Sequence, residues 1–207
     1  MLTLETDRLT LRPFTADDAD FVLDLYSRME VQRYISGQPP KLMKDRTEAL
    51  ALIEAWARRD DGTCGIWAVQ EKASQEKAAQ DQITGQLTGT LLLKPIPASG
   101  PELRESGDIE IGWHFHPDFW GRGYAPEAAA AVLQHGFDAG LPRIVAVTNP
   151  ANTASMRVCG KIGLQAQGTT DRYYNKTCQL FTADNPAGNA AENPAAAAVG
   201  NAAGAGS

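Results

Sequence analysis

Alternating apolar and polar residues mark a series of short β-strands along the chain. Residues 8–14 (RLTLRPF) alternate up to a proline, and residues 108–116 (DIEIGWHFH) alternate without interruption. In a strand, this alternation directs one set of side chains into a core and the other set away from it. Apolar and β-branched runs predict further strands at residues 65–71, 83–94 and 143–148, and a final strand pair within residues 169–181.

In most segments between these strands, apolar residues recur at the spacing of an α-helix. Thr15 stands where a helix N-cap is expected, ahead of an acidic first turn and an apolar stripe over residues 21–26. Further helices are predicted at residues 44–59, 126–139 and 152–163, the last closed by Gly163. The chain therefore has the pattern of a mixed α/β (α+β) protein, with one β-loop-α-β-α unit in its second half.

The composition changes sharply near Asn185. Residues 185–207 consist almost entirely of Ala, Gly, Asn and Pro. Such a segment buries too little apolar surface to offset the entropy of ordering it. We therefore predict one folded domain over residues 1–184 and a disordered tail over residues 185–207. A second biased stretch, residues 72–82, is predicted to be a solvated connection between two strands.

The balance of charged residues argues against some classes of binding partner. Lys and Arg number 19 against 25 Asp and Glu, which gives a formal net charge of −6, and no basic block occurs. Binding nucleic acid without sequence preference needs a basic face, so we expect no nucleic-acid partner. We also expect no membrane partner, because the chain has neither a signal-peptide pattern nor a run of roughly eighteen apolar residues. Three cysteines without metal-ligand spacing favour a reducing compartment, and we expect a cytoplasmic protein.

The strand at residues 108–116 carries chemistry on one face. Ile109, Ile111, Trp113 and Phe115 form its apolar face. The opposite face holds Asp108, Glu110, Gly112, His114 and His116. One face is therefore predicted to be core, and the other to be a candidate site.

A glycine loop and a helix follow this strand. Gly121 and Gly123 permit positive φ and a close backbone approach, and Pro126 suits the first turn of a helix. Unpaired N–H groups at a helix N-terminus bind phosphate without any net positive charge. Arg122 is a candidate for a further phosphate contact. By itself, G-x-G before a helix is equally compatible with a plain tight turn, and the third glycine of a dinucleotide-binding loop is replaced by Pro126.

Several motifs together resemble one protein family. They are residues 110–112 (EIG), 116–117 (HP), 120–125 (WGRGYA), 152–155 (NTAS) and 161–164 (KIGL). In this order and spacing, the chain is similar to the GNAT superfamily of acetyl-CoA-dependent N-acetyltransferases, and most closely to its RimJ/RimL type. The resemblance covers roughly residues 2–183 and leaves out only the predicted tail.

The resemblance implies a fold and a cosubstrate site. It implies a twisted, mostly antiparallel sheet that splays at the strand carrying Glu110 and is flanked by helices. Acetyl-CoA would be the cosubstrate, without a metal, and an amine would be the acceptor. Pantetheine would bind the backbone of Trp113, His114 and Phe115, and the pyrophosphate would bind N–H groups of Gly121, Arg122, Gly123, Tyr124 and Ala125. The superfamily loop opens with Gln or Arg, and Trp120 occupies that position here.

Acyl transfer to an amine requires a base and a proton for the leaving thiolate. Glu110 is the candidate base because partial burial on the loaded strand face would raise its pKa; it is alternatively a structural acid bonded to a neighbouring strand. Many superfamily members place a Tyr proton donor seven residues after the Asn of the short helix, and here that position is Cys159. The RimJ/RimL resemblance points instead to Ser155, and water is a third alternative. Asn152 is expected to bind the coenzyme or to cap its helix.

Two other classes of function remain open at this point. His114, His116 and Glu110 have the spacing of metal ligands on one strand face, which is also compatible with a metal-dependent hydrolase. The missing Tyr is compatible with an inactive acyl-CoA-binding module. Tyr173 and Tyr174 are expected on opposite faces of the last strands, where one of them could line an acceptor pocket or both could pack in the core. The acceptor is expected to be a protein N-terminus or a small-molecule amine, and the protein to be a monomer or a homodimer.

Overall fold

The structure is a computed structural model of the 207-residue chain. It describes residues 1–35, 39–73 and 85–187. The connection predicted at residues 72–82 lies outside the described residues except for its first two positions. Most of the predicted tail lies outside them as well, because only residues 185–187 of that segment are described.

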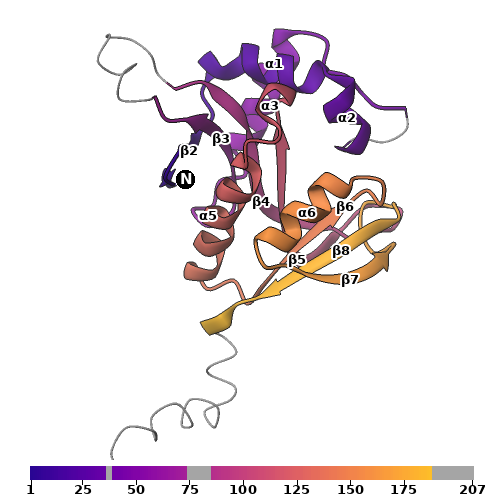
Figure 1. Cartoon of the computed structure of the whole chain (residues 1–207). Coiled ribbons are helices and arrows are strands. Elements are labelled where there is room, and N and C mark those ends of the chain that lie inside the picture. The colour runs from indigo at the N-terminus through magenta and orange to yellow at the C-terminus, as the bar shows by residue number, and fades with distance from the viewer. Residues whose placement is uncertain (36–38, 74–84, 188–207) are drawn as a thin grey trace, which may run out of the picture.

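One mixed sheet of eight strands organises the fold (Figure 1), in the order β1-β2-β3-β4-β5-β6-β8-β7. Neighbouring strands are antiparallel except β5 and β6, which are parallel. The strands are β1 (Leu4–Glu5), β2 (Leu9–Pro13), β3 (Gly65–Glu71), β4 (Leu87–Pro97), β5 (Glu105–Phe115), β6 (Arg143–Thr148), β7 (Gln165–Thr170) and β8 (Cys178–Asp184). The mixed, mostly antiparallel architecture expected from the sequence is therefore confirmed.

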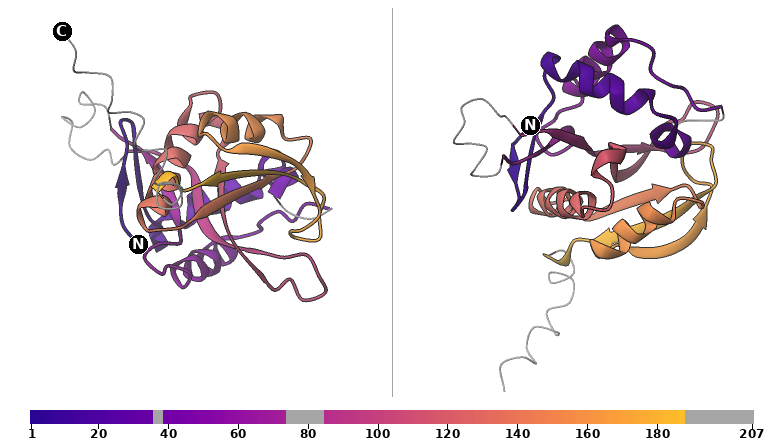
Figure 2. Two further views of the ribbon diagram at one scale, coloured as in Figure 1. Left: turned by 90° about the horizontal axis from the view of Figure 1, so that it is seen from below. Right: turned by 45° about the horizontal axis from the view of Figure 1, so that its top comes forward.

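Helices cover both faces of this sheet (Figure 2). On one side lie α1 (Ala19–Ser27), which follows the short helix η1 (Ala16–Asp18), then α2 (Met29–Ile35) and α3 (Arg46–Ala57). On the other side lie α5 (Tyr124–Asp138) and α6 (Thr153–Lys161). None of the helices in the described part of the chain has the length and apolarity of a transmembrane span.

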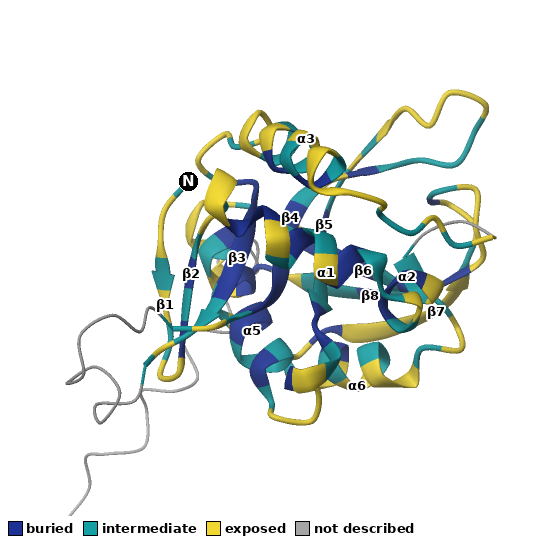
Figure 3. Ribbon diagram, turned by 90° about the horizontal axis from the view of Figure 1, so that it is seen from above, coloured by how far each residue is buried: buried dark blue, intermediate teal, exposed yellow. Residues whose placement is uncertain are grey.

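The core has two main parts, one on each side of the sheet. Ile111 and Phe115 of β5 pack with α5 and the neighbouring strands in the larger cluster. Val22 and Leu25 of α1 pack with Ile53 of α3 in the second cluster. The central strands are largely buried and the outward sides of the helices are exposed (Figure 3). The apolar face predicted for β5 is therefore a core face.

The sheet opens between β5 and β6. The ladder between β4 and β5 runs from Gly89 opposite Phe115 to Lys94 opposite Glu110 and beyond. In contrast, β5 and β6 pair at a single position, Glu110 with Val145. The carboxyl half of β5 therefore has a ladder on only one side, as the expected splay requires.

Two local expectations differ from the structure. The helix predicted from Pro126 begins two residues earlier, at Tyr124, because Gly123 adopts φ +81° and serves as its N-cap. The expectation that Tyr173 and Tyr174 lie on strands is wrong, because both belong to the turn between β7 and β8. Asn175 holds that turn by donating its side-chain amide to the Gly100 carbonyl at 3.0 Å. A turn fixed by such long-range contacts leaves no trace in the local alternation of the sequence.

Replacing Gly89 by Ala should destabilise the fold at the splay. The added Cβ would lie 2.6 Å from the backbone oxygen of His114 and 2.8 Å from the Phe115 ring, so β4 and β5 would have to separate. We expect a loss of about 1–3 kcal/mol in the free energy of unfolding, measured by urea denaturation.

Gly160→Ala is the matched control. A Cβ at this position of α6 meets nothing within 4 Å. Ala has the higher helix propensity, so the control should gain up to about 1 kcal/mol. Equal stability of the two variants would contradict the crowding between β4 and β5.

Candidate active site

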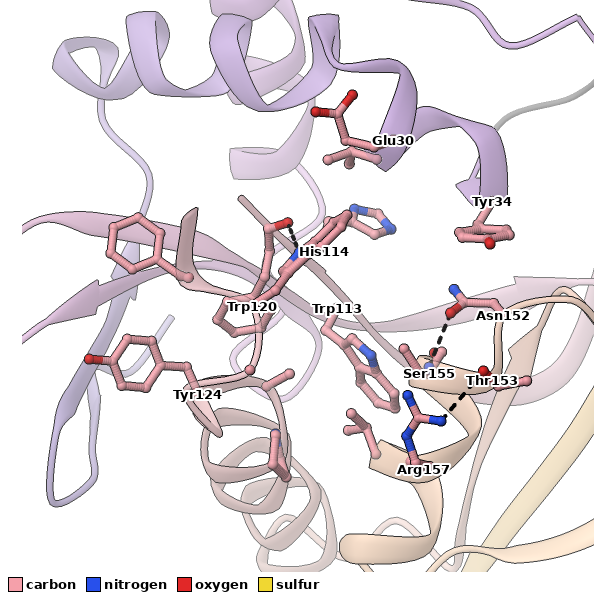
Figure 4. A pocket seen from close by; sticks show the side chains of 18 of the residues that line it. Glu30, Tyr34, Trp113, His114, Trp120, Tyr124, Asn152, Thr153, Ser155 and Arg157 are labelled. Atoms are coloured by element: carbon pink, nitrogen blue, oxygen red, sulfur yellow. Dashed lines mark hydrogen bonds between the residues drawn. The ribbon is translucent and has the colours of Figure 1, made fainter. Parts of the chain in front are cut away.

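A pocket of about 600 Å³ opens at the carboxyl end of β5, between α2, the loop before α5 and α6 (Figure 4). The structure brings most of the predicted site residues together here. Those that line the pocket are Trp113, His114, Phe115, Gly121, Gly123, Tyr124, Ala125, Asn152 and Ser155. Three others, Glu110, Arg122 and Cys159, do not line it.

The backbone of β5 offers hydrogen-bonding groups to the gap at alternate residues. His116 donates its N–H to the Thr88 carbonyl on β4 at 2.9 Å. Backbone groups alternate in direction along an antiparallel pair, so those of His114 also face β4, whereas those of Trp113 and Phe115 face the gap. The indole of Trp120 already donates to the Phe115 carbonyl at 2.7 Å. Three residues were expected to bind pantetheine through the backbone. The backbone groups of one of them, His114, face β4 and not the gap.

The loop before α5 presents free N–H groups to the same pocket. Gly121 and Gly123 have φ of +76° and +81°, a conformation that glycine adopts without strain. The first helical bond at this end runs from the Glu127 N–H to the Gly123 carbonyl. The N–H groups of Tyr124 and Ala125 thus precede the helical ladder and are available to an anion, with the helix dipole behind them.

Arg8 of the first hairpin fixes the position of this loop. Its backbone N–H and its Nε donate to the Glu127 carboxylate at 2.9 and 2.7 Å, and its Nη1 donates to the Arg122 carbonyl at 3.0 Å. Burial raises the pKa of Glu127, but hydrogen bonds from Thr6 and Arg8 outweigh burial and hold it below its usual value. The start of α5 is therefore anchored by a residue 119 positions away in sequence.

Cationic side chains reach the pocket from α6, at positions that were not predicted, and from α2. Arg122, the expected phosphate contact, stacks over the Phe119 ring at 4.9 Å. Arg157 and Lys161 of α6 and Arg33 of α2 line the pocket instead. The i,i+4 spacing of Arg157 and Lys161 places them on one face of α6, which is the sequence signal that could have found them.

The start of α6 carries Ser155 into the pocket. Asn152 is the N-cap and accepts the Ser155 N–H at 3.1 Å, so it caps its helix while also lining the pocket. Figure 4 shows Asn152 and Ser155 on the same rim, across from Tyr34 of α2. The Ser155 hydroxyl makes no hydrogen bond within the described part of the chain and is free to meet a ligand.

Cys159 lies one turn further along α6 but faces the core. Its side chain is 1% exposed and belongs to the main hydrophobic cluster. Burial raises the pKa of its thiol to about 12. The structure therefore separates the two proton-donor candidates, with Ser155 in the pocket and Cys159 out of reach of it.

Glu110 lies in the layer behind the pocket. It is 6% exposed, accepts a hydrogen bond from the Tyr174 hydroxyl and forms an ion pair with Lys94, its partner across the β4–β5 ladder. Burial, together with the adjacent Glu110 charge, raises the pKa of Tyr174. Tyr174 is therefore a protonated donor to Glu110, and the turn that carries it completes this cluster.

His114 contacts α1 through its imidazole. The Tyr26 hydroxyl lies 2.9 Å from His114 Nδ1. Burial and the Lys94 charge lower the pKa of His114 to about 4, while burial raises the pKa of Tyr26. At neutral pH the Tyr26 O–H accordingly donates to an uncharged imidazole.

The residues of β5 that have the spacing of metal ligands do not come together as a metal site. His116 Nε2 lies 3.0 Å from Asp24 Oδ2, while His114 is engaged by Tyr26. No group of three or more His, Cys, Asp or Glu side chains that could hold a metal occurs among the residues the structure describes. The spacing of His114, His116 and Glu110 therefore gives the hydrolase hypothesis no structural support.

Comparison with known proteins agrees with this geometry. The family model described as "Acetyltransferase (GNAT) domain" matches residues 8–165. The chain is 31% identical over 172 residues to "Uncharacterized N-acetyltransferase YoaA" of Bacillus subtilis (strain 168), covering 82% of this chain and 86% of that protein.

Solved structures share the fold. A GNAT-family acetyltransferase from Bacillus anthracis superposes with a TM-score of 0.66 at 25% identity, over 89% of this chain and 99% of its own. RimL, a ribosomal L7/L12 alpha-N-protein acetyltransferase in complex with coenzyme A, superposes with a TM-score of 0.67 at 14% identity, over 88% of this chain and 98% of its own. At that identity, RimL is a relative in fold alone.

Protonation of His114 should destabilise the fold below neutral pH. The pKa of about 4 in the folded chain lies below the ordinary 6.5, so the unfolded chain takes up the proton more readily. The contribution of the neutral imidazole is present above pH 6.5 and is lost as the pH falls toward 4. The side chain is only partly buried, so we expect a loss of about 1–2 kcal/mol, less than the full ~3 kcal/mol of the shift.

Urea denaturation between about pH 7 and about pH 5 tests this effect. His114→Asn keeps an acceptor for the Tyr26 hydroxyl but has no group that titrates in this range. The wild-type chain should lose stability relative to the variant as the pH falls. Parallel stability curves would show that His114 does not couple protonation to folding.

Proposed function

We propose that this chain, which belongs to the GNAT family of acetyltransferases and is an acetyl-CoA-dependent acyltransferase, transfers the acetyl group to a primary amine. The observation that carries the proposal is the pocket beside the open half of β5. It joins an unpaired strand edge, free N–H groups at the start of α5 and the hydroxyl of Ser155 in one cavity.

The residues present fit acetyl-CoA. The gap-facing backbone of Trp113 and the Phe115 N–H suit the amide groups of a pantetheine arm. The N–H groups of Tyr124 and Ala125 suit a pyrophosphate, and Arg157 and Lys161 add positive charge along α6. The bound cosubstrate supplies an acetyl group already activated as a thioester.

Glu110 is the proposed base, acting directly or through a water. Lys94 and Tyr174 hold its carboxylate in one position, at the only pairing between β5 and β6. In the transfer, the amine gives a proton to Glu110, a C–N bond forms to the acetyl carbon and the C–S bond breaks. Ser155 donates a hydrogen bond to the departing thiolate and passes it a proton, which the hydroxyl regains from solvent water, in a single complex of enzyme, acetyl-CoA and amine.

We further propose that the chain is of the RimJ/RimL type. Three features support this: the WGRGYA loop at residues 120–125, the NTAS segment at residues 152–155 and the position of Ser155 in the pocket. The acceptor of this type would be a protein N-terminus or a small-molecule amine.

Glu110→Gln should lower kcat by about 100-fold with little change in coenzyme A affinity, because the base is lost and the pocket is not. Thiol release from acetyl-CoA across peptides, amino acids, polyamines and aminoglycosides measures turnover, and calorimetry measures coenzyme A binding.

Asp108→Asn is the control, since Asp108 shares the strand face and accepts the Tyr173 hydroxyl at 2.7 Å. The Asp108→Asn variant should have the same turnover as the wild-type chain. Full turnover in Glu110→Gln would instead make Glu110 a structural acid that pairs with Lys94.

Ser155 and Cys159 should respond differently to truncation. Ser155→Ala removes the pocket hydroxyl and should lower kcat by about tenfold or more at unchanged stability. Cys159→Ala leaves the pocket intact and should cost about 1 kcal/mol of stability at unchanged kcat, because it opens a small cavity in the core. Loss of turnover in a folded Cys159→Ala would reverse the two assignments, and full turnover in both would leave water as the proton donor.

A further inference from the structure

A second pocket lies on the other face of β5. Its volume is about 200 Å³, and residues of α1, α3 and strands β3–β5 line it. His114 lines both this pocket and the larger one, so the two meet at its side chain. Lys94, the ion-pair partner of Glu110, also lines the second pocket. A ligand held here therefore approaches the proposed base from the side opposite the acetyl-CoA pocket.

One buried hydroxyl in this pocket, that of Thr90, has unused hydrogen-bonding capacity. Thr90 is 1% exposed, and its Oγ1 makes no hydrogen bond of acceptable geometry to any described residue. Its polar neighbour is the Tyr26 hydroxyl, which contacts Thr90 and is itself bonded to His114 Nδ1. Thr88, two residues earlier on the same strand, shows the normal arrangement, since its hydroxyl donates to the Val69 carbonyl at 3.0 Å. A hydroxyl has one donor and two acceptor sites, so Thr90 can still accept a hydrogen bond from a polar ligand even when it contacts Tyr26.

The mouth of the pocket carries an unpaired positive charge. Arg59 lines it from the end of α3 and forms no ion pair within the described part of the chain. Its neighbour Arg58, which does not line the pocket, has Glu54 within 4.0 Å. Because Lys94 is paired with Glu110, exposed Arg59 carries the uncompensated positive charge of this pocket. A ligand with only ammonium groups would be repelled, and one with an anionic group would be attracted.

The walls between these polar groups are apolar. The apolar lining residues are Leu52, Trp56, Ile66 and Leu92. The volume accommodates a molecule of amino-acid size. The pocket thus combines a hydroxyl at its floor, an apolar middle and a cation at its mouth.

We propose that this second pocket is the acceptor site and that it takes a small amine bearing a carboxylate. The carboxylate contacts Arg59, the apolar body lies against Trp56, and the amine points toward Thr90 and His114. This inference rests on the proposed function, since it identifies the amine that receives the acetyl group. The amine loses its proton to Glu110 through water, and the new C–N bond forms as the C–S bond breaks. The thiolate takes a proton by way of Ser155, so the N-acetyl product and free coenzyme A thiol leave.

Pairs of amines with and without the carboxylate test the site. Suitable pairs are 5-aminopentanoate with pentylamine, and leucine with 3-methylbutylamine. Calorimetry on the full chain with coenzyme A bound measures affinity without any turnover, and thiol release from acetyl-CoA measures transfer. In at least one pair, the carboxylated amine should bind at least about tenfold more tightly than its partner.

Arg59→Ala and Arg58→Ala form the matched pair of variants. Arg59→Ala should remove the preference for the carboxylate: the carboxylated amine should bind more weakly, whereas the plain amine, which the arginine repels, should bind at least as tightly as before. Arg58→Ala should change neither. Thr90→Val, which keeps the shape of the side chain and removes the hydroxyl, should weaken both amines several-fold and leave coenzyme A binding intact.

Each outcome separates this inference from the proposed function. Equal affinity within both pairs, or equal effects of the two arginine variants, overturns the acceptor site. If plain amines or peptides are then still acetylated, the proposed function stands without it. Tight binding of a carboxylated amine with no thiol release from any acceptor supports the pocket as a binding site and overturns the proposed N-acetylation.

Discussion

The site depends on a break in backbone hydrogen bonding beside β5. This strand keeps a long ladder with β4 but pairs with β6 only at Glu110 and Val145. Backbone N–H and C=O groups must be bonded somewhere, so the edge left open requires other partners. The Trp120 indole satisfies the Phe115 carbonyl, and Trp113 remains exposed to the gap. The interruption of the sheet is therefore also what makes room for a ligand with amide groups.

Both pockets carry local positive charge, although the net charge of the chain is −6. Toward the proposed cosubstrate, N–H groups at the start of α5 act together with the cations of α6. Toward the proposed acceptor, the side-chain charge of Arg59 acts, because the charge of Lys94 is paired with Glu110. Local geometry thus outweighs the overall charge, because helix N-termini and cations at a pocket act over a few ångströms, whereas distant surface acids are screened.

The two faces of β5 have different roles in the site. Its apolar face, with Ile111 and Phe115, belongs to the core beneath α5. Its polar face presents Glu110 and His114 to contacts from β4, α1 and the β7–β8 turn. Tyr174 reaches Glu110 only because that turn docks on the β4–β5 connection through Ser99 and Gly100. Segments far apart in sequence therefore converge on one carboxylate.

The sequence alone determined the mixed fold, the two faces of β5 and the glycine loop, because side-chain alternation and glycine conformation are local properties. Most of the site residues that it predicted do line the large pocket. Tertiary structure decided what depends on distant partners. It turned the His114 backbone toward β4, buried Cys159, moved Arg122 onto Phe119 and brought Arg157 and Lys161 to the pocket. It also placed Tyr174 beside Glu110. A residue's type shows what chemistry it can perform, but packing across the sheet decides which groups face each other, and no local pattern encodes that choice.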